Sequence, residues 1–295
     1  MNSLPFHIVD VFTTRKFAGN QLAVFQKASA LSDEEMQSLA QEMNFSEVTF
    51  IESTEQRDGG YDVRIFDPVT EMEFAGHPTL GTAHVLREYI LDHSPDQIYL
   101  NLKVGQIPVR IEDGTEAVQY WMQQIPPTFT RQLDHTFLAS VLGLSQADLD
   151  TEYPVQVVST GLPTAIVPVK SLNAIESILI DNEYYNEFID EFGEMMLLCF
   201  TPETVEPQHD LHARVFAGYS NVPEDSATGS SNGCLSAYLF ENNYYNTDEI
   251  EITVEQGYEM GRPSKLYHRS KKSNEEIEIQ IGGSVVSVAQ GRLLD

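Results

Sequence analysis

RIFDPVTEMEFAGHPTLGTA, residues Arg64–Ala83, decides the fold, because the same pattern returns half a chain later. Its strand-like start, Arg64-Ile-Phe66, leads through an acidic loop to a turn of small residues, AGHPTLG. The second copy runs from Arg214-Val-Phe216 to ATGSSNG, at offsets of 150 and 152 residues in a chain of 295. Each copy predicts a strand, an acidic loop, a turn and a helix. An offset near half the chain length indicates two copies of one fold.

Strand and helix patterns surround both copies. Ser32 and Glu35 form a capping box that predicts a helix start, and Pro78 is suited to the first position of a helix over 78–91. Further helices are expected at 134–142, 171–193 and 231–240. Strands are expected at 6–12, 22–25, 48–51, 61–66, 98–104, 107–111, 117–122, 154–158, 165–169, 195–200 and 211–216, and again between Ile250 and Leu293. Many neighbouring strands lack an intervening helix, which favours mixed or antiparallel sheets. Pro126-Pro127 predicts a boundary between halves 1–127 and 128–295, with a C-terminal strand near 284–291 returning to the first half.

Composition excludes several classes of partner. The chain has 17 Lys+Arg against 45 Asp+Glu, a net charge of −28. It therefore lacks the basic footprint of a nucleic-acid binder and the Lys/Arg clusters of a polybasic membrane binder. There is no signal-peptide pattern and no run of 18 apolar residues, so we expect a cytoplasmic enzyme or small-molecule binder. Cys199 and Cys234 lie in apolar runs and are expected to be small buried side chains, and no His/Asp/Glu spacing suggests a metal cluster.

The two small-residue turns are candidate ligand sites. Gly76 and Gly229 let a ligand approach the backbone closely, and the helix that follows each turn offers free N–H groups and the positive end of its dipole. If the halves face each other, the two helix starts bind a carboxylate without Lys or Arg. The alternative is that these glycines only serve tight turns.

Three ionisable residues are candidates for chemistry. Glu47 lies among Phe45, Val48 and Phe50, so partial desolvation is expected to raise its pKa toward that of a general acid/base, although the spacing alone favours an exposed edge-strand Glu. His77, at a helix start, is expected to be neutral and to hydrogen-bond substrate. Asp225 can cap the second helix, hold a substrate amine or hydroxyl, or orient His77.

A competing motif is the nucleophile elbow of serine hydrolases. Gly229-Ser230-Ser231-Asn232-Gly233 fits G-x-S-x-G, and Asp248 and His268 follow in the required order. PEDSAT precedes the motif where an apolar strand is required, so the hydrolase interpretation is disfavoured.

Several motifs together carry a family resemblance. They are IVDVFTTRKFAGNQLAVF (Ile8–Phe25), AQEMNFSEVTF (Ala40–Phe50), the Arg64–Ala83 stretch, EDSATGSSNG (Glu224–Gly233) and GYEMGRPS (Gly257–Ser264). The chain resembles the PhzF-like phenazine biosynthesis isomerase family, which is related in fold to diaminopimelate epimerase. The resemblance implies an α+β (mixed α/β) fold of two similar halves. Each half is a curved mixed sheet that wraps a central helix, and the active site lies in the cleft between them.

The resemblance also implies an activity and its residues. It implies an isomerase with no cofactor and no metal, a small anionic metabolite as substrate, and a homodimer. Glu47 would move the proton, His77, Asp225 and Ser230 would bind and orient the substrate, and Gly76 and Gly229 would offer backbone N–H groups. Racemase relatives place a Cys at each turn, where this chain has Ala75 and Thr228, so a two-thiol racemase is disfavoured. An epimerase and a non-catalytic binder of the same fold remain alternatives.

Overall fold

The computed structural model describes residues 4–218, 222–273 and 276–294. The chain divides into two units, which are described separately below. Unit 1 is Met1–Gln123 with Gly282–Asp295, and unit 2 is Gln124–Ile281. The division after Gln123 falls four residues before the end of the sequence-based first half, and the C-terminal segment is assigned to unit 1.

Unit 1 alternates short strands with two main helices. Its elements are β1 (Pro5–Val11), β2 (Asn20–Gln26), η1 (Ala28–Ala30), α1 (Asp33–Met43), β3 (Glu47–Ile51), β4 (Tyr61–Phe66), β5 (Glu71–Met72), α2 (Gly76–Val85), η2 (Leu86–Ile90), β6 (Gln97–Leu102), β7 (Gly105–Asp113) and β8 (Val118–Gln123). The last strand, β17 (Glu276–Arg292), begins in unit 2 and ends in unit 1. The predicted capping box is confirmed, because Ser32 and Glu35 exchange both hydrogen bonds at the start of α1.

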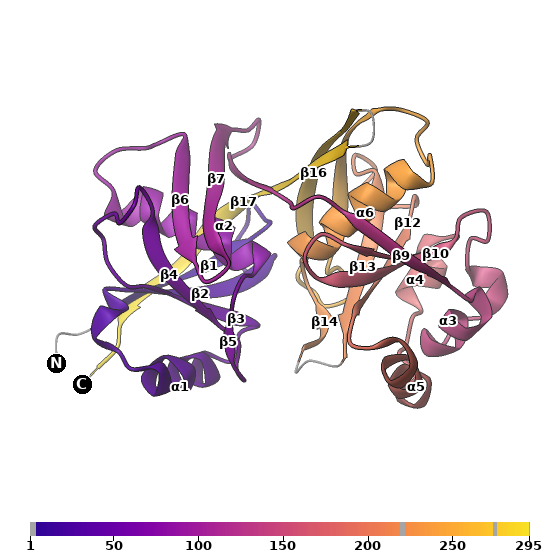
Figure 1. Cartoon of the computed structure of the whole chain (residues 1–295), viewed down its shortest axis with the longest axis horizontal. Coiled ribbons are helices and arrows are strands. Elements are labelled where there is room, and N and C mark those ends of the chain that lie inside the picture. The colour runs from indigo at the N-terminus through magenta and orange to yellow at the C-terminus, as the bar shows by residue number, and fades with distance from the viewer. Residues whose placement is uncertain (1–3, 219–221, 274–275, 295) are drawn as a thin grey trace. The chain divides into compact units, whose positions relative to one another are not determined.

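The strands of unit 1 form a mixed sheet that closes on itself. β2 pairs in parallel with β3, and β4 with β6, while the pairs β1/β2, β3/β4, β6/β7 and β7/β8 are antiparallel. β17 pairs with both β1 and β8, so the pairings lead around a complete ring. The ring surrounds α2 (Figure 1), and the short strand β5 pairs only with β4.

Helix α2 is the core of unit 1. Every residue from His77 to Val85 is buried, and the helix packs on β1, β2, β3, β6, β7 and β8. A helix that is buried on all sides needs no polar face, and small and apolar residues accordingly make up most of α2. Gly81 allows the closest approach, because a Cβ there would lie 2.5 Å from Cδ2 of Leu22.

Unit 2 repeats this order of elements. It contains β9 (Thr128–Leu133), α3 (His135–Val141), η3 (Gln146–Asp148), β10 (Val155–Ser159), β11 (Pro163–Pro168), α4 (Leu172–Glu176), α5 (Asn182–Phe192), β12 (Met196–Thr201), β13 (Leu211–Ala217), β14 (Val222–Asp225), α6 (Gly229–Glu241), β15 (Glu249–Gln256) and β16 (Ser264–Ser273). β11/β12 and β13/β15 are parallel, and β10/β11, β12/β13 and β15/β16 are antiparallel, as in unit 1. The buried helix α6 takes the place of α2 and packs on β10, β11, β12 and β16.

The repeat seen in the sequence is also a repeat of contacts. Arg64 makes two hydrogen bonds to the carboxylate of Glu71, at 2.7 and 2.8 Å, and its guanidinium lies 5.1 Å from the Phe66 ring centroid. Arg214 bonds Glu224 at 2.8 and 2.9 Å and lies 4.9 Å from the Phe216 centroid. Equivalent arginines therefore link equivalent strands, β4 to β5 in unit 1 and β13 to β14 in unit 2.

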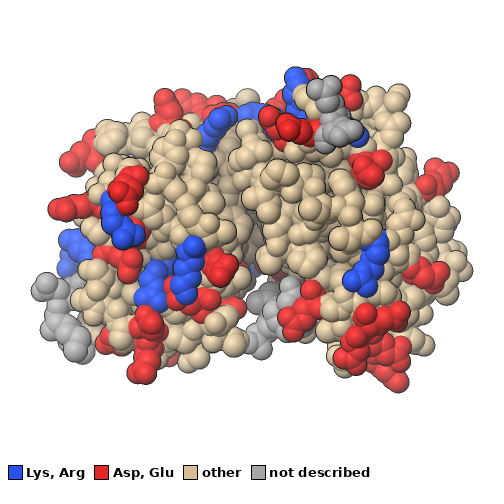
Figure 2. All heavy atoms as spheres, viewed as in Figure 1, with Lys and Arg blue, Asp and Glu red and all other residues tan. Residues whose placement is uncertain are grey.

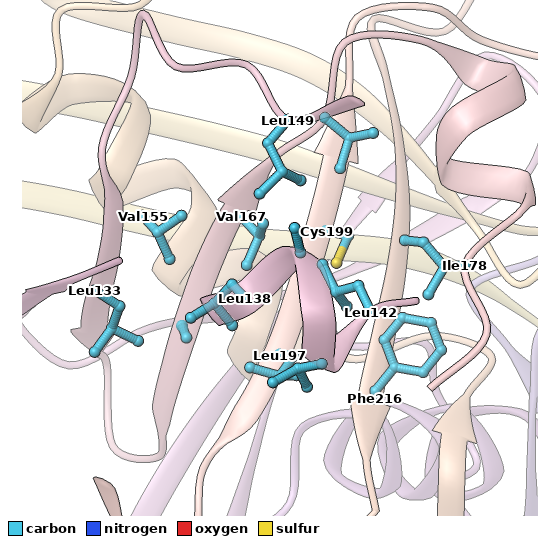
Figure 3. Packing of buried hydrophobic residues seen from close by; sticks show 14 of the residues in the cluster. Leu133, Leu138, Leu142, Leu149, Val155, Val167, Ile178, Leu197, Cys199 and Phe216 are labelled. Atoms are coloured by element: carbon cyan, nitrogen blue, oxygen red, sulfur yellow. The ribbon is translucent and has the colours of Figure 1, made fainter. Parts of the chain in front are cut away.

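An apolar cluster packs between the sheet of unit 2 and the helices α3, α4 and α5. Leu138 of α3 and Leu142, the residue that follows this helix, pack with Leu197, Cys199 and other buried side chains of the sheet (Figure 3). Burial raises the pKa of the Cys199 thiol to about 12, so this cysteine is a packing residue, as its apolar surroundings in sequence predicted.

The structure corrects three helix predictions. α2 and α6 begin at Gly76 and Gly229, each two residues earlier than expected, and an α-helix ending at Val85 is followed by one π-helical turn. The helix expected at 171–193 is two helices, because Asp181 accepts hydrogen bonds from the N–H groups of Glu183 and Tyr184 and starts a new one.

The surface of unit 2 shows where part of the excess negative charge lies. Helix α5 buries Tyr185 and Phe188, and its acidic side chains gather on the surface at the place of this helix (Figure 2). Within the described part of the chain, no helix has the length and apolar character needed to cross a membrane.

Candidate active site

Glu47 begins strand β3 in the interior of the unit 1 sheet. It is the register partner of Leu22 on β2, and the next residue, Val48, pairs with Phe66 on β4. The Glu47 side chain is 17% exposed. The alternative of an exposed edge-strand carboxylate is therefore wrong.

His77 faces this carboxyl group from the first turn of α2. Its Nε2 lies 3.3 Å from Oε2 of Glu47, and its side chain is 6% exposed. Burial lowers the pKa of His77 to about 3, against a smaller opposing effect of a hydrogen bond to the backbone of Gln21. The predicted neutral imidazole is confirmed, but burial rather than the helix dipole is the main cause.

The surroundings of the imidazole define where its proton lies. The Gln21 bond favours the charged ring, as a bond to a carbonyl acceptor does, so a ring N–H donates to it. Nε2 faces Glu47, which leaves Nδ1 as that donor. Nε2, the nitrogen without a proton, therefore lies 3.3 Å from Oε2 of Glu47, and the two atoms form no hydrogen bond in this geometry. Gln21 was not singled out in the sequence, because its role uses only its backbone.

The start of α2 also presents backbone N–H groups. Its N-cap, Ala75, has no side chain that could bond them, and Gly76 is the first helical residue. A helix start of this kind attracts anions through its N–H groups and dipole.

Asp225 and the start of α6 form a second group of candidates, in unit 2. Asp225 ends β14, and its Oδ2 accepts a hydrogen bond of 2.6 Å from Oγ1 of Thr228. Thr228 is the N-cap of α6, yet its side chain makes no capping bond to the helix. Gly229 and Ser230 follow in the first turn.

The structure thus brings the predicted residues together in two sets. Glu47, Gly76 and His77 lie together in unit 1, and Asp225, Gly229 and Ser230 lie together in unit 2. Sequence reasoning missed the buried polar residues that support the second set, Asn232, Gln256 and His268 as a hydrogen-bonded group. They are separated along the chain and share no motif.

The structure contradicts the serine-hydrolase interpretation. Ser231 is fully buried inside α6, and its Oγ contacts Oγ1 of Thr164 at 3.1 Å and the sulfur of Met196 at 3.3 Å. The ring nitrogens of His268 are bonded to Ser236 and Asn232 instead of Ser231. No strained turn exposes this serine, as an elbow requires.

The two cysteines are poorly suited to act as nucleophiles. Burial raises the pKa of Cys234, as it does that of Cys199, so neither is a ready thiolate. Among the described residues, no group of three or more His, Cys, Asp or Glu side chains could hold a metal ion.

Solved structures of other proteins share this mixed α/β fold. A phenazine biosynthesis protein of the PhzF family from Bacillus anthracis matches all of both chains with a TM-score of 0.93 at 30% identity. A probable proline racemase from Agrobacterium radiobacter shares the fold, with a TM-score of 0.63 at 10% identity over 99% of this chain and 93% of its own.

Comparison of sequences shows the family. The phenazine biosynthesis-like protein (PhzC-PhzF) family matches residues 9–291. The trans-2,3-dihydro-3-hydroxyanthranilate isomerase of Pseudomonas aeruginosa is 33% identical over 97% of each chain, and an uncharacterized isomerase, YfhB, of Bacillus subtilis is 31% identical over 94% of each. The chain belongs to the phenazine biosynthesis-like family and is an isomerase of that family.

Proposed function

We propose that this isomerase moves a proton between carbon atoms of a small carboxylate-bearing metabolite, with Glu47 as the general acid/base and no cofactor or metal. The contact between Glu47 and a buried neutral His77 carries the proposal. An ionised Glu47 would take a proton from an activated carbon, and the electrons of the broken C–H bond would delocalise into the substrate. The same carboxyl group would return a proton to another carbon as the new C–H bond forms.

His77 would tune this step without taking the proton itself. A neutral ring with an unprotonated Nε2 beside the carboxyl group would accept a hydrogen bond from the protonated form of Glu47, which is the form that follows proton removal. Because the pKa of His77 is about 3, the ring competes poorly for the proton. A carboxyl group that takes up a proton in one step and returns it in the next suits general acid/base catalysis.

The remaining candidates would bind the substrate. In unit 1, backbone N–H groups at Gly76 would bind an anionic group. In unit 2, the N–H groups of Gly229 and Ser230 would do the same, and Asp225 would accept a hydrogen bond from an amine or hydroxyl. A bulk charge of −28 gives no steering to such an anion, so its attraction would be local to the helix starts. We further propose a homodimer that acts in the cytoplasm without nucleic-acid or membrane partners, and light scattering tests the dimer.

Epimerisation is the second candidate activity. It needs a proton removed from one face of a carbon and returned on the other. A structure described as a predicted epimerase from Pseudomonas aeruginosa matches with a TM-score of 0.82 at 29% identity. We favour isomerisation, because Ala75 has no acid/base group and the Thr228 hydroxyl is bonded to Asp225.

The decisive experiment compares Glu47→Gln with Glu52→Gln, a matched change just beyond the end of β3. Trans-2,3-dihydro-3-hydroxyanthranilate and related cyclic amino acids are incubated in D2O, and products are followed by NMR and mass. We expect Glu47→Gln to lose about 10²- to 10⁴-fold in turnover and Glu52→Gln to match wild type.

Each other outcome has a clear meaning. Full turnover by Glu47→Gln contradicts the proposed role of Glu47. Deuterium gained with inversion at one carbon indicates the epimerase instead. Ligand binding without any conversion by wild type indicates a non-catalytic binder.

A further inference from the structure

A continuous run of polar side chains is buried between α6 and strands β15 and β16. It begins inside the unit and ends at Asp225. Its members, in the order of contact, are Ser236, His268, Asn232, Gln256, Thr228 and Asp225. The first four are fully buried and Thr228 is 8% exposed. Buried polar groups of this kind need complete hydrogen bonding, so their donor and acceptor roles can be worked out.

Backbone groups fix the orientation of the Gln256 amide. Its Nε2 lies 2.8 Å from the carbonyl of Asp225, which can only accept, and its Oε1 lies 3.3 Å from the N–H of Thr228, which can only donate. The same Nε2 lies 3.1 Å from Oγ1 of Thr228. The Thr228 hydroxyl therefore accepts from Gln256.

The Asn232 amide is fixed in the same way. Its Nδ2 lies 3.0 Å from the carbonyl of Thr228 and 2.9 Å from Oε1 of Gln256, both acceptors. Its Oδ1 must then accept from Nε2 of His268, at 2.9 Å.

His268 completes the direction of the run. Burial lowers its pKa to about 3, so the ring carries one proton, and that proton is on Nε2. Nδ1 must accept from the hydroxyl of Ser236, at 2.7 Å. Every donor in the run therefore points toward Asp225.

At the end of the run, the Thr228 hydroxyl has one proton to give. Its oxygen already accepts from Gln256, so the proton is directed to Oδ2 of Asp225, 2.6 Å away. A proton on Oδ2 would meet this hydrogen. The run cannot reverse to receive it, because the carbonyls of Asp225 and Thr228 hold both amides in place.

We propose that Thr228 and Gln256 are positioning residues that hold the carboxyl group of Asp225 in one orientation with its Oδ2 unprotonated, ready to accept a hydrogen bond from the substrate. This inference rests on the proposed function only in assigning substrate binding to Asp225. Thr228 acts through its hydroxyl, which orients a neighbour and is not itself an acid or base. Proton movement then belongs to Glu47.

The direction of the run can be measured without any substrate. Nitrogen NMR of protein labelled in histidine distinguishes the two ring tautomers, and the His268 signal is assigned by its loss in His268→Gln. We expect His268 to carry its proton on Nε2 throughout the neutral pH range. A proton on Nδ1, or a charged ring, would overturn the inference.

The positioning role is tested with Thr228→Val, Thr228→Ser and Thr164→Val. The last is a matched control, since Thr164 is a fully buried threonine that bonds Ser231 outside the run. We expect Thr228→Val to lose about 10- to 100-fold in kcat/KM, the usual effect of losing a hydrogen bond to a charged group. Thr228→Ser should recover to within about threefold, and Thr164→Val should stay within about threefold of wild type, by the same reasoning.

Thermal unfolding of the three variants shows whether a loss of activity comes with a loss of stability. Equal activity losses in Thr228→Val and Thr164→Val would indicate a merely structural role and would overturn the proposal, as would wild-type activity in Thr228→Val. If wild type converts no substrate, the proposed function fails, while the tautomer measurement still decides the direction of the run.

Discussion

His212 lies at the centre of a buried charged cluster in unit 2, and replacing it should destabilise the protein in a pH-dependent way. Its Nδ1 lies 2.7 Å from Oε1 of Glu255 and its Nε2 lies 2.9 Å from Oε1 of Glu259. His209 adds a contact of 2.7 Å to the other oxygen of Glu255. Burial alone would lower the pKa of His212, but the two carboxylates outweigh it and raise the pKa to about 9.

The size and sign of the effect follow from this shift. The difference between the ordinary value of 6.5 and about 9 corresponds to about 3 kcal/mol of folding free energy, at about 1.4 kcal/mol per pH unit. Because the pKa is raised in the folded state, this stabilisation is fully present below about pH 6.5. It is lost as the pH rises through about 9.

The assay is urea unfolding of wild type, His212→Gln and the exposed control His93→Gln at about pH 6.5, 8 and 10, followed by circular dichroism. We expect His212→Gln to be destabilised by about 3 kcal/mol at about pH 6.5, with a deficit that shrinks toward about pH 10. His93→Gln should follow wild type at each pH. A deficit that is the same at both ends of this range would refute the reasoning, since packing rather than charge would then explain it.

Two further substitutions test the packing of each unit. Arg214→Met should lower the unfolding free energy by about 3–5 kcal/mol, because it leaves the Glu224 carboxylate without its bidentate partner and frees the carbonyls of Ile175 and Ile178; a loss below about 1 kcal/mol in urea unfolding would show that this ion pair contributes little. Gly81→Ala should lower the melting temperature through a loss of about 1–3 kcal/mol, since the added Cβ would meet Leu22 at 2.5 Å, and an unchanged melting temperature would mean that α2 can shift within its ring of strands.

Much of the fold could be predicted from short patterns. The Arg-x-Phe pairs at Arg64 and Arg214 predicted two related halves, and the same ion pairs and ring contacts occur in both. At the start of α2, tertiary contacts override local preference. Gly76 and His77 are weak helix formers, yet they lie in the first turn of α2 because that helix is enclosed by strands.

The candidate site was predictable only in part. Glu47 and His77 lie in contiguous motifs, so their residue types and approximate positions were visible in the sequence. Their contact at 3.3 Å joins positions 30 residues apart, and the proton of His77 is placed by a backbone bond to Gln21. No linear pattern contains that information, because it depends on which strand lies beside which helix.

The sequence by itself determined most of the order of elements, the capping box of α1 and the acidic character of the chain, because these depend on composition and on neighbours along the backbone. Only the tertiary structure decided which groups are charged and which way protons point. Burial makes His77 and His268 neutral, while His212, also buried, is charged because Glu255 and Glu259 face it. The physical reason is that desolvation and hydrogen bonding act through space, between residues that the fold alone brings together.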